Sequence, residues 1–300
     1  MTNQTVPVTV VIPAWNREAL IARAVESALA QVPGRPAEII VVDDCSSDAT
    51  GAVAEALGAR VIRHEVNQGE AGARNTGVAA ASHEWVAFLD SDDEWLPTHL
   101  ATVWRERAAH VLVASSARRV DPDGTAHLHG SLSRKPVVVR DPRLLLFPDN
   151  PVPASGTLAR KDQVLEAGGF SDWKLGADLD MWVRLSERGT VLVRPEVGVN
   201  YYRHADQLSS DGTQMREGLV TLARSYRERP WCTDRFLAQI DQGARWDELT
   251  AALKTKNFRA IGGVVARVAR SGPRGWLATL SVGSGRARRR LRSRSLLGEG

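Results

Sequence analysis

Three acidic side chains lie within four residues in Asp90-Ser91-Asp92-Asp93, directly after the apolar run 85–89. Carboxylates this close repel one another, so they destabilise a fold unless a cation or hydrogen-bond donors compensate. Mg²⁺ and Mn²⁺ suit such a group, because Mg²⁺ takes one or two protein carboxylates and completes its shell with water and substrate phosphates. Asp92 and Asp90 are therefore candidate metal ligands. The alternative is a solvated acidic turn before the helix that Pro97 opens.

A second polar group, Asp43-Asp44-Cys45-Ser46-Ser47-Asp48, follows another apolar run and precedes a predicted helix. Serine and aspartate commonly cap helix N-termini, so Ser46, Ser47 or Asp48 is predicted to do so here. Capping does not explain Asp43 and Asp44. A carboxylate at this point can accept the imide N–H of uracil or the hydroxyl of a sugar, which makes the pair a candidate binding site.

Two further charged residues lie near helix starts. Arg74 stands between glycines in 67–77, where an arginine and a helix N-terminus would both attract a phosphate. Asp178 opens a later helix, where a cap or a partner of the helix dipole accounts for it. In the same helix Asp180 and Arg184 are four residues apart, which predicts a surface ion pair.

Alternating apolar periods predict the elements that position these residues. Short β-branched runs indicate buried strands, and apolar residues every three to four positions indicate amphipathic helices. The predicted strands are 6–12, 38–43, 60–64, 85–89 and 111–114, and the predicted helices are 17–31, 48–57, 71–81 and 97–109. Asn16 is the predicted cap of the first helix.

This order predicts an α/β sheet covered on both faces, in which ligands bind beyond the carboxyl ends of the strands. The polar segments 13–17, 43–48 and 90–94 each follow a predicted strand. Helices are predicted again at 160–167 and 178–188, a strand at 190–194, and a helical pattern from residue 214. We predict a domain over 1–213, a helical region over 214–282 and a basic flexible tail over 283–300.

Composition excludes several classes of protein. The 300 residues are 43% hydrophobic and 25% charged, as in a globular chain of one or two domains. Cys45 and Cys232 have no zinc-ligand spacing and are too few for a disulfide framework, which favours a reducing compartment. No apolar run approaches the roughly 18 residues of a membrane-spanning helix. These features predict a cytoplasmic protein.

The net charge of +4 comes from the tail, because six arginines fall within 286–294. The rest of the chain has 33 basic and 35 acidic residues, which does not favour a nucleic-acid partner. The tail is either a peripheral contact with anionic lipid at the inner face of the membrane or a disordered solubilising end.

Six ordered blocks occur along the chain: VVIPAWNR, EIIVVDDCSSDAT, NQGEAGARNTG, WVAFLDSDDEWLP, GGF and ADLDMWVRL. Over about residues 8–204 this succession resembles the family-2 glycosyltransferases, which are inverting enzymes with a GT-A fold. The resemblance implies a Rossmann-like, mostly parallel sheet flanked by helices, with a C-terminal helical appendage. Residues 1–120 would form the nucleotide-sugar half and residues 121–213 the acceptor half.

The resemblance also implies a role for each motif. The implied nucleotide-sugar contacts are Pro13, Ala14, Trp15, Asn16, Asp44, Arg74, Asp90 and Ser91. Asp92 is implied as the direct ligand of Mn²⁺ or Mg²⁺, with Asp90 beside it and His204 as a later ligand of the metal or diphosphate. Asp178 is implied as the catalytic base.

The chain departs from the family pattern at two positions. Cys45 stands where the family usually has Gly, and Ala177 stands where it usually has Glu. The missing glutamate removes a group that orients the acceptor, so a glycan, a lipid-linked and a small-molecule acceptor all stay open.

The predicted reaction is metal-assisted transfer of a sugar from a nucleotide diphosphate, with UDP favoured, to a hydroxyl with inversion. The alternatives are a metal-dependent nucleotidyl- or phosphoryltransferase and a non-catalytic nucleotide-sugar-binding protein.

Overall fold

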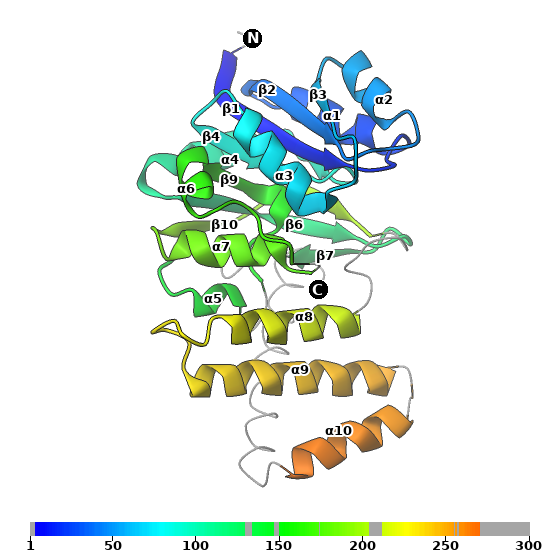
Figure 1. Cartoon of the computed structure of the whole chain (residues 1–300), viewed down its shortest axis with the longest axis vertical. Helices are drawn as coiled ribbons and strands as arrows, with labels where there is room; N and C mark the ends of the chain where they lie inside the picture. The colour runs from blue at the N-terminus through cyan, green and yellow to red at the C-terminus, as the bar shows by residue number, and fades with distance from the viewer. Residues whose placement is uncertain are drawn as a thin grey trace.

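The computed structural model describes residues 4–129, 134–146, 150–173, 175–203, 212–254, 256 and 258–270. In these residues ten strands form one sheet. The sheet fills the upper part of the molecule in Figure 1, and helices α8, α9 and α10 follow one another below it. This is the α/β fold with a helical C-terminal region that the sequence predicted.

The first half of the chain builds the parallel part of the sheet. β1 (Gln4–Ala14) lies between β2 (Gly34–Asp43) and β4 (Trp85–Phe88), and β3 (Arg60–Arg63) pairs with β2. All three pairings are parallel. The carboxyl ends of β1, β2 and β4 therefore meet at one edge, as predicted from the polar segments that follow them.

The second half of the sheet is mixed. β9 (Thr157–Arg160) lies antiparallel between β4 and β6 (Leu112–Val120), and β10 (Val191–Tyr202) runs parallel to β6. Three short strands pair antiparallel with these: β5 (Glu94–Trp95) and β8 (Val137–Val139) with β10, and β7 (Ala126–His129) with β6. β9 was not predicted, because it follows the proline-rich stretch 136–153, which breaks the alternation of strands and helices that indicated the equally short β3 and β4.

Ten helices occur in the described ranges: α1 (Ile21–Leu29), α2 (Thr50–Ala56), α3 (Gly69–Ala80), α4 (His99–Trp104), α5 (Arg143–Leu146), α6 (Lys161–Glu166), α7 (Ala177–Ser186), α8 (Gly212–Ser225), α9 (Asp234–Lys254) and α10 (Phe258–Arg270). α3 and α7 lie close to their predicted ranges. α4 ends five residues early, and a 3₁₀ turn at Arg107–Ala109 completes the segment.

The predicted caps of the first two helices are wrong. Asn16 has a left-handed backbone (φ 51°), and the turn after it delays α1 until Ile21. Its side-chain oxygen accepts the Ser47 N–H at 2.9 Å instead of capping α1. α2 follows Ala49 without a side-chain cap, while Asp48 accepts the N–H groups of Glu18 and Thr50 at 3.0 Å each. Local sequence did not reveal that these two loops would bind each other.

Helices cover both faces of the sheet because alternate strand residues enter different cores. Val11 and Phe88 pack in one core with Trp182 of α7, whereas Val10 and Ala87 pack in a second core with residues of α1 and α4. The near-continuous apolar strands of the sequence therefore reflect burial on both sides.

The helical region shares the first of these cores. Leu222 within α8, Tyr226 directly after it and Phe236 of α9 belong to the same buried cluster as Phe88 and Trp182. The domain boundary predicted at residue 213 stays a prediction, as does the division near 120. Among the described helices, none combines the length and apolar character needed to cross a membrane.

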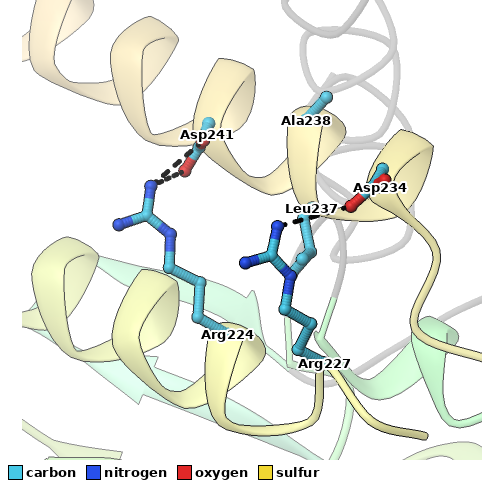
Figure 2. A pocket seen from close by; sticks show the side chains of 6 residues that line it. All are labelled: Arg224, Arg227, Asp234, Leu237, Ala238 and Asp241. Atoms are coloured by element: carbon cyan, nitrogen blue, oxygen red, sulfur yellow. Dashed lines mark hydrogen bonds and ion pairs between the residues drawn. The ribbon is translucent and has the colours of Figure 1, made fainter.

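Figure 2 shows a pocket of about 480 Å³ between α8 and α9. Arg224 and Arg227 line it and face Asp241 and Asp234 at 3.0 and 3.6 Å. Each arginine has a carboxylate opposite, so these pairs link the two helices and present no excess charge to a ligand.

Candidate active site

The ends of β1 and β2 are joined directly. The Asp44 N–H donates to the Ala14 carbonyl at 2.8 Å. Pro13 and Ala14 are buried, whereas the Trp15 side chain is 53% exposed. Asn16 connects the same loops, since its N–H donates to Ser46 Oγ at 2.9 Å. The implied base-lining segment therefore lies beside Asp44 with one aromatic surface open.

Asp43 is internal to the fold rather than open to a ligand. Its Oδ1 accepts the Ser46 N–H at 2.9 Å, and its Oδ2 accepts the Arg63 guanidinium at 2.8 and 2.9 Å. Burial acts to raise the pKa of this carboxyl, but the hydrogen bonds from Ser46 and Arg63 outweigh burial and lower it. Both oxygens of Asp43 therefore accept hydrogen bonds within the fold, and a ligand contact of Asp43 stays a prediction.

Asp44 is also buried but is bound on one oxygen. Oδ1 lies 2.6 Å from His64 Nδ1 and accepts the Gln68 N–H at 2.8 Å. We call Asp43, Asp44, Arg63 and His64 the β2 cluster. In it, each carboxylate has donors supplied by the end of β3 or the following loops.

A second group of charges gathers after β4. We call it the β4 cluster: Asp90, Asp92 and Asp93, Glu70 and Arg74 of α3, and Asp178 of α7. Arg74 is 2% exposed and pairs with Asp90 at 2.6 Å and with Glu70. Burial acts against its charge, but Glu70 and Asp90 raise its pKa. In this structure Arg74 neutralises carboxylates, and its predicted phosphate contact stays a prediction.

Asp93 is the most enclosed carboxylate of the β4 cluster. It accepts the Ser155 hydroxyl on Oδ2 and the Tyr202 N–H on Oδ1 at 3.3 Å. Burial and the neighbouring Asp90 and Asp92 raise its pKa well above the usual range. Ser91, between these aspartates, is buried as well. Burial beside like charges thus disfavours the ionised form of Asp93.

Asp178 lies in the first turn of α7, partly buried, after Gly176 in a left-handed conformation (φ 85°). Burial raises the pKa of Asp178, while the Arg74 guanidinium and the Leu179 N–H act in the opposite direction. Asp90 raises it further. A carboxylate with a raised pKa is a better proton acceptor near neutral pH, as a general base requires.

The donor set of the β4 cluster fits a hard divalent cation, since it gathers carboxylate oxygens at one edge of the sheet. No group of three His, Cys, Asp or Glu side chains in the described ranges could hold a metal alone. Mg²⁺ usually binds through one or two carboxylates and substrate phosphates. Asp90 is paired with Arg74, and the assignment of Asp92 as the direct metal ligand stays a prediction. His204 lies outside the described residues.

Asp180 and Arg184 form the predicted pair at 2.6 Å, but it is not on the surface. Asp180 is 5% exposed and also accepts the hydroxyls of Ser171 and Tyr226. Tyr226 follows α8, so the helical region binds the helix that carries Asp178. This contact spans 46 residues and has no local signal.

Three other residues of the site were missed. Glu70 and His64 carried no motif of their own, and Ser155 lies in a proline-rich stretch. Ser155 Oγ accepts the Asp90 N–H at 3.1 Å and donates to Asp93, while its carbonyl accepts the Trp95 indole N–H at 2.6 Å. Ser155 precedes β9, and the antiparallel pairing of β9 with β4 brings this serine to the end of β4. The contacts of Ser155 with Asp90 and Asp93 therefore depend on the insertion of β9 into the sheet.

Cys45 adopts a left-handed backbone (φ 65°), a conformation in which glycine is favoured. The family's usual glycine at this position thus has a physical reason. The thiol lies at the surface, 3.4 Å from the Glu65 carbonyl.

Comparison with known proteins gives the same assignment. Residues 9–166 match the model of glycosyl transferase family 2. Over 96 residues the chain is 49% identical to the succinoglycan biosynthesis protein ExoO of Rhizobium meliloti, covering 31% of this chain and 27% of ExoO. The chain thus matches only about a quarter of that relative's length.

Two solved structures are similar in fold. S. aureus TarS in complex with UDP-GlcNAc has a TM-score of 0.59 at 18% identity, covering 82% of this chain and 73% of that one. Mannosyltransferase PcManGT from Pyrobaculum calidifontis, in complex with GDP-Man and Mn²⁺, has a TM-score of 0.60 at 18% identity, covering 94% and 80%. The fold is therefore the GT-A fold. Since the family profile spans the strands whose ends hold both acidic clusters, the chain belongs to glycosyl transferase family 2.

Proposed function

We propose that the protein transfers a sugar from a nucleotide diphosphate, with UDP as the nucleotide, to an acceptor hydroxyl with inversion of the anomeric centre. The observation that carries the proposal is the β4 cluster. It brings Asp90, Asp92 and Asp93 together with a separate carboxylate, Asp178, and the pKa values of Asp93 and Asp178 are raised. A cation site and a proton acceptor thus share one edge of the sheet.

Asp92, assisted by Asp90, would hold Mn²⁺ or Mg²⁺. When bound, such a cation neutralises the charge that develops on a leaving diphosphate. Support comes from the oxygen-only donor set and from PcManGT, whose structure contains Mn²⁺ with GDP-Man.

Asp178 would remove the acceptor proton. The acceptor oxygen forms a bond to the anomeric carbon as the bond from that carbon to the diphosphate oxygen breaks, and the proton moves to the Asp178 carboxylate. The products are a glycoside and a nucleoside diphosphate. A single displacement from the opposite face inverts the anomeric centre.

The nucleotide would bind at the ends of β1 and β2. Asp44 offers a carboxylate oxygen to the base. The exposed Trp15 indole follows Ala14, whose carbonyl accepts the Asp44 N–H, so Trp15 and Asp44 belong to the two loops that this bond joins. Arg74, Asp90 and Ser91 would lie toward the ribose and diphosphate. The acceptor class stays open, since glycans, lipid-linked sugars and small molecules all present hydroxyls.

A screen of nucleotide sugars tests the proposal. With Mn²⁺ present, a UDP-sugar is expected to raise the melting temperature of the full chain, and EDTA is expected to remove the effect. Turnover should release nucleoside diphosphate with a glycosylated product. Pyrophosphate release would instead indicate a nucleotidyltransferase, and donor binding without turnover under any acceptor would indicate a non-catalytic protein.

A further inference from the structure

His64 is held on three sides at the end of β3. Its backbone N–H donates to the Asp43 carbonyl at 2.9 Å, Nδ1 lies 2.6 Å from Asp44 Oδ1, and Nε2 lies 2.9 Å from Thr76 Oγ1. The residue is 8% exposed. Neither ring nitrogen is left for a ligand, so its contact with Asp44 is its means of acting on one.

Donor and acceptor chemistry sets the direction of these bonds. An ionised carboxylate only accepts hydrogen bonds, so Nδ1 must donate to Asp44. In a neutral imidazole Nε2 then accepts, and the Thr76 hydroxyl can supply that hydrogen. The Asp44 carboxylate therefore sets the tautomer, and the Thr76 hydroxyl on α3 satisfies Nε2 by donating to it.

The Asp44 carboxylate is used unequally as a result. Oδ1 receives both the His64 ring N–H and the Gln68 N–H at 2.8 Å, which occupies its two lone pairs. Oδ2 accepts no hydrogen bond from any residue in the described ranges, and it is not sealed from solvent. One oxygen is thus available beside the segment 13–16.

Nucleobases differ in how many donors they present to such an oxygen. Uracil has a single ring N–H between two carbonyls, whereas guanine presents a ring N–H and an adjacent amino N–H in parallel. A carboxylate with two open oxygens matches guanine, and a carboxylate with one open oxygen leaves a guanine donor unpaired. Cytosine has an unprotonated ring nitrogen at the position of the uracil N–H, which would face Oδ2 unfavourably.

We propose that His64 is a positioning residue that restricts Asp44 to one accepting oxygen and thereby makes the site select a uracil-type base over guanine. This inference rests on the proposed function, because it takes Asp44 as the group that meets the base. It concerns base selection and not the chemical step.

Calorimetric titration of the full chain with UDP and with GDP, both with Mn²⁺, tests the proposal. The wild type is expected to bind UDP at least about tenfold more tightly than GDP, since an unpaired buried donor costs at least that much. His64→Ala is expected to weaken UDP binding about tenfold and to shrink the preference, because Oδ1 is freed and the carboxylate can turn.

Conservative variants separate positioning from general damage. The Asn amide nitrogen can occupy the place of Nδ1, so His64→Asn should restore most of the UDP affinity and the preference. In His64→Gln the amide extends toward the place of Nε2, so restoration should be poor. Thr76→Val should give a smaller loss than His64→Ala.

His110→Ala is the matched control, because the His110 ring also binds a threonine hydroxyl, Thr190 Oγ1 at 2.8 Å. His110 precedes β6, so it lies at the amino end of a strand, whereas the candidate site lies at the carboxyl ends. It should leave both dissociation constants unchanged. Near-ultraviolet circular dichroism checks that every variant is folded, and if His64→Ala is not, His64→Asn and His64→Gln decide the result.

The outcomes distinguish this inference from the proposed function. If the wild type binds no nucleotide, both fall. If Asp44→Ala weakens UDP binding but His64→Ala changes neither affinity nor preference, only the role of His64 is overturned. A wild-type preference for GDP overturns base selection and leaves sugar transfer standing. Equal restoration of UDP affinity by His64→Asn and His64→Gln also overturns the positioning role of His64 and leaves sugar transfer standing.

Discussion

The β2 and β4 clusters both place aspartates at the ends of buried parallel strands, yet their charges are balanced in opposite ways. Asp43 meets a guanidinium and a backbone N–H, and these bonds lower its pKa despite burial. Asp93 is equally enclosed, but burial and two neighbouring aspartates raise its pKa. Asp43 thus has a guanidinium partner, whereas the named partners of Asp93 are the Ser155 hydroxyl and the Tyr202 N–H, beside two further carboxylates.

This difference indicates what each group is for. Carboxylates with fixed partners hold their geometry without a ligand, as a site that reads the shape of a base requires. Carboxylates in excess cost stability unless a cation arrives, and such local instability is common at functional sites. The clusters should therefore respond differently to substitution, pH and metal.

The largest effect is expected for Asp178→Asn. If Asp178 is the base, turnover should fall by about 10²- to 10⁴-fold, while binding of the nucleotide changes little. In the wild type, activity should rise with pH as Asp178 loses its proton. Because burial raises the pKa of Asp178, this rise in activity should occur at a pH above the ordinary pKa range of aspartate. The pH dependence of kcat/KM measures it.

The stability of the same variant provides the control. Removing a carboxylate whose folded pKa is raised should not lower the melting temperature near neutral pH. Wild-type turnover by folded Asp178→Asn would remove this residue from the mechanism.

Asp92→Asn tests the cation site. Mn²⁺ at 100 times its dissociation constant would stabilise the wild type by about 2.7 kcal/mol, and this gain should disappear in the variant. Asp43→Asn should keep its Mn²⁺ response, measured as the shift in melting temperature with UDP present. An equal loss in both variants would mean that the two clusters do not differ in the proposed way.

Asp43→Asn and Asp93→Asn should change stability in opposite directions. Loss of the Arg63 pair and of a charged acceptor for Ser46 should lower the free energy of unfolding by about 1–3 kcal/mol. Asp93→Asn should leave that free energy unchanged or raise it at pH 7, because it removes a carboxylate whose ionised form is disfavoured. Urea unfolding near neutral pH compares them.

The pH dependence of unfolding sharpens the same contrast. Asp43 has a lowered folded pKa, so its contribution is present above its unfolded pKa and is lost as pH falls through the folded value. Asp93 has a raised folded pKa, so its unfavourable effect is present at higher pH and is relieved as pH falls through the folded value. Parallel curves for the two variants would contradict the assignment.

The smallest effect is expected for Cys45→Gly. Glycine adopts the left-handed backbone at this position without strain, so the variant should gain about 0.5 to 1 kcal/mol after the entropy that glycine adds to the unfolded chain. Thermal unfolding measures the change, and Cys45→Ala, which keeps a Cβ, is the control. A stability loss in Cys45→Gly would show that the β2 cluster depends on the thiol contact with Glu65.

Much of the parallel half of the fold could be predicted from the sequence. Strand and helix periods between residues 6 and 89 come from local alternation. The resemblance assigned roles to Asp92 and Asp178 that local chemistry alone left open. Those roles, together with His204 and the arginine-rich tail beyond the described residues, stay predictions. β9 and Ser155 were not predicted, because they follow a proline-rich stretch that breaks the local alternation, and the insertion of β9 between β4 and β6 is a long-range pairing.

The sequence by itself determined which residues stand at the ends of the buried strands, because side-chain polarity and strand period are local properties. Only the tertiary structure decided which of those carboxylates are neutralised. Asp44 depends on His64, Asp93 on Ser155, and Asp180 on Tyr226, and these pairs are 20, 62 and 46 residues apart. The charge balance of a buried group depends on partners that chain folding brings to it, and no local pattern encodes them.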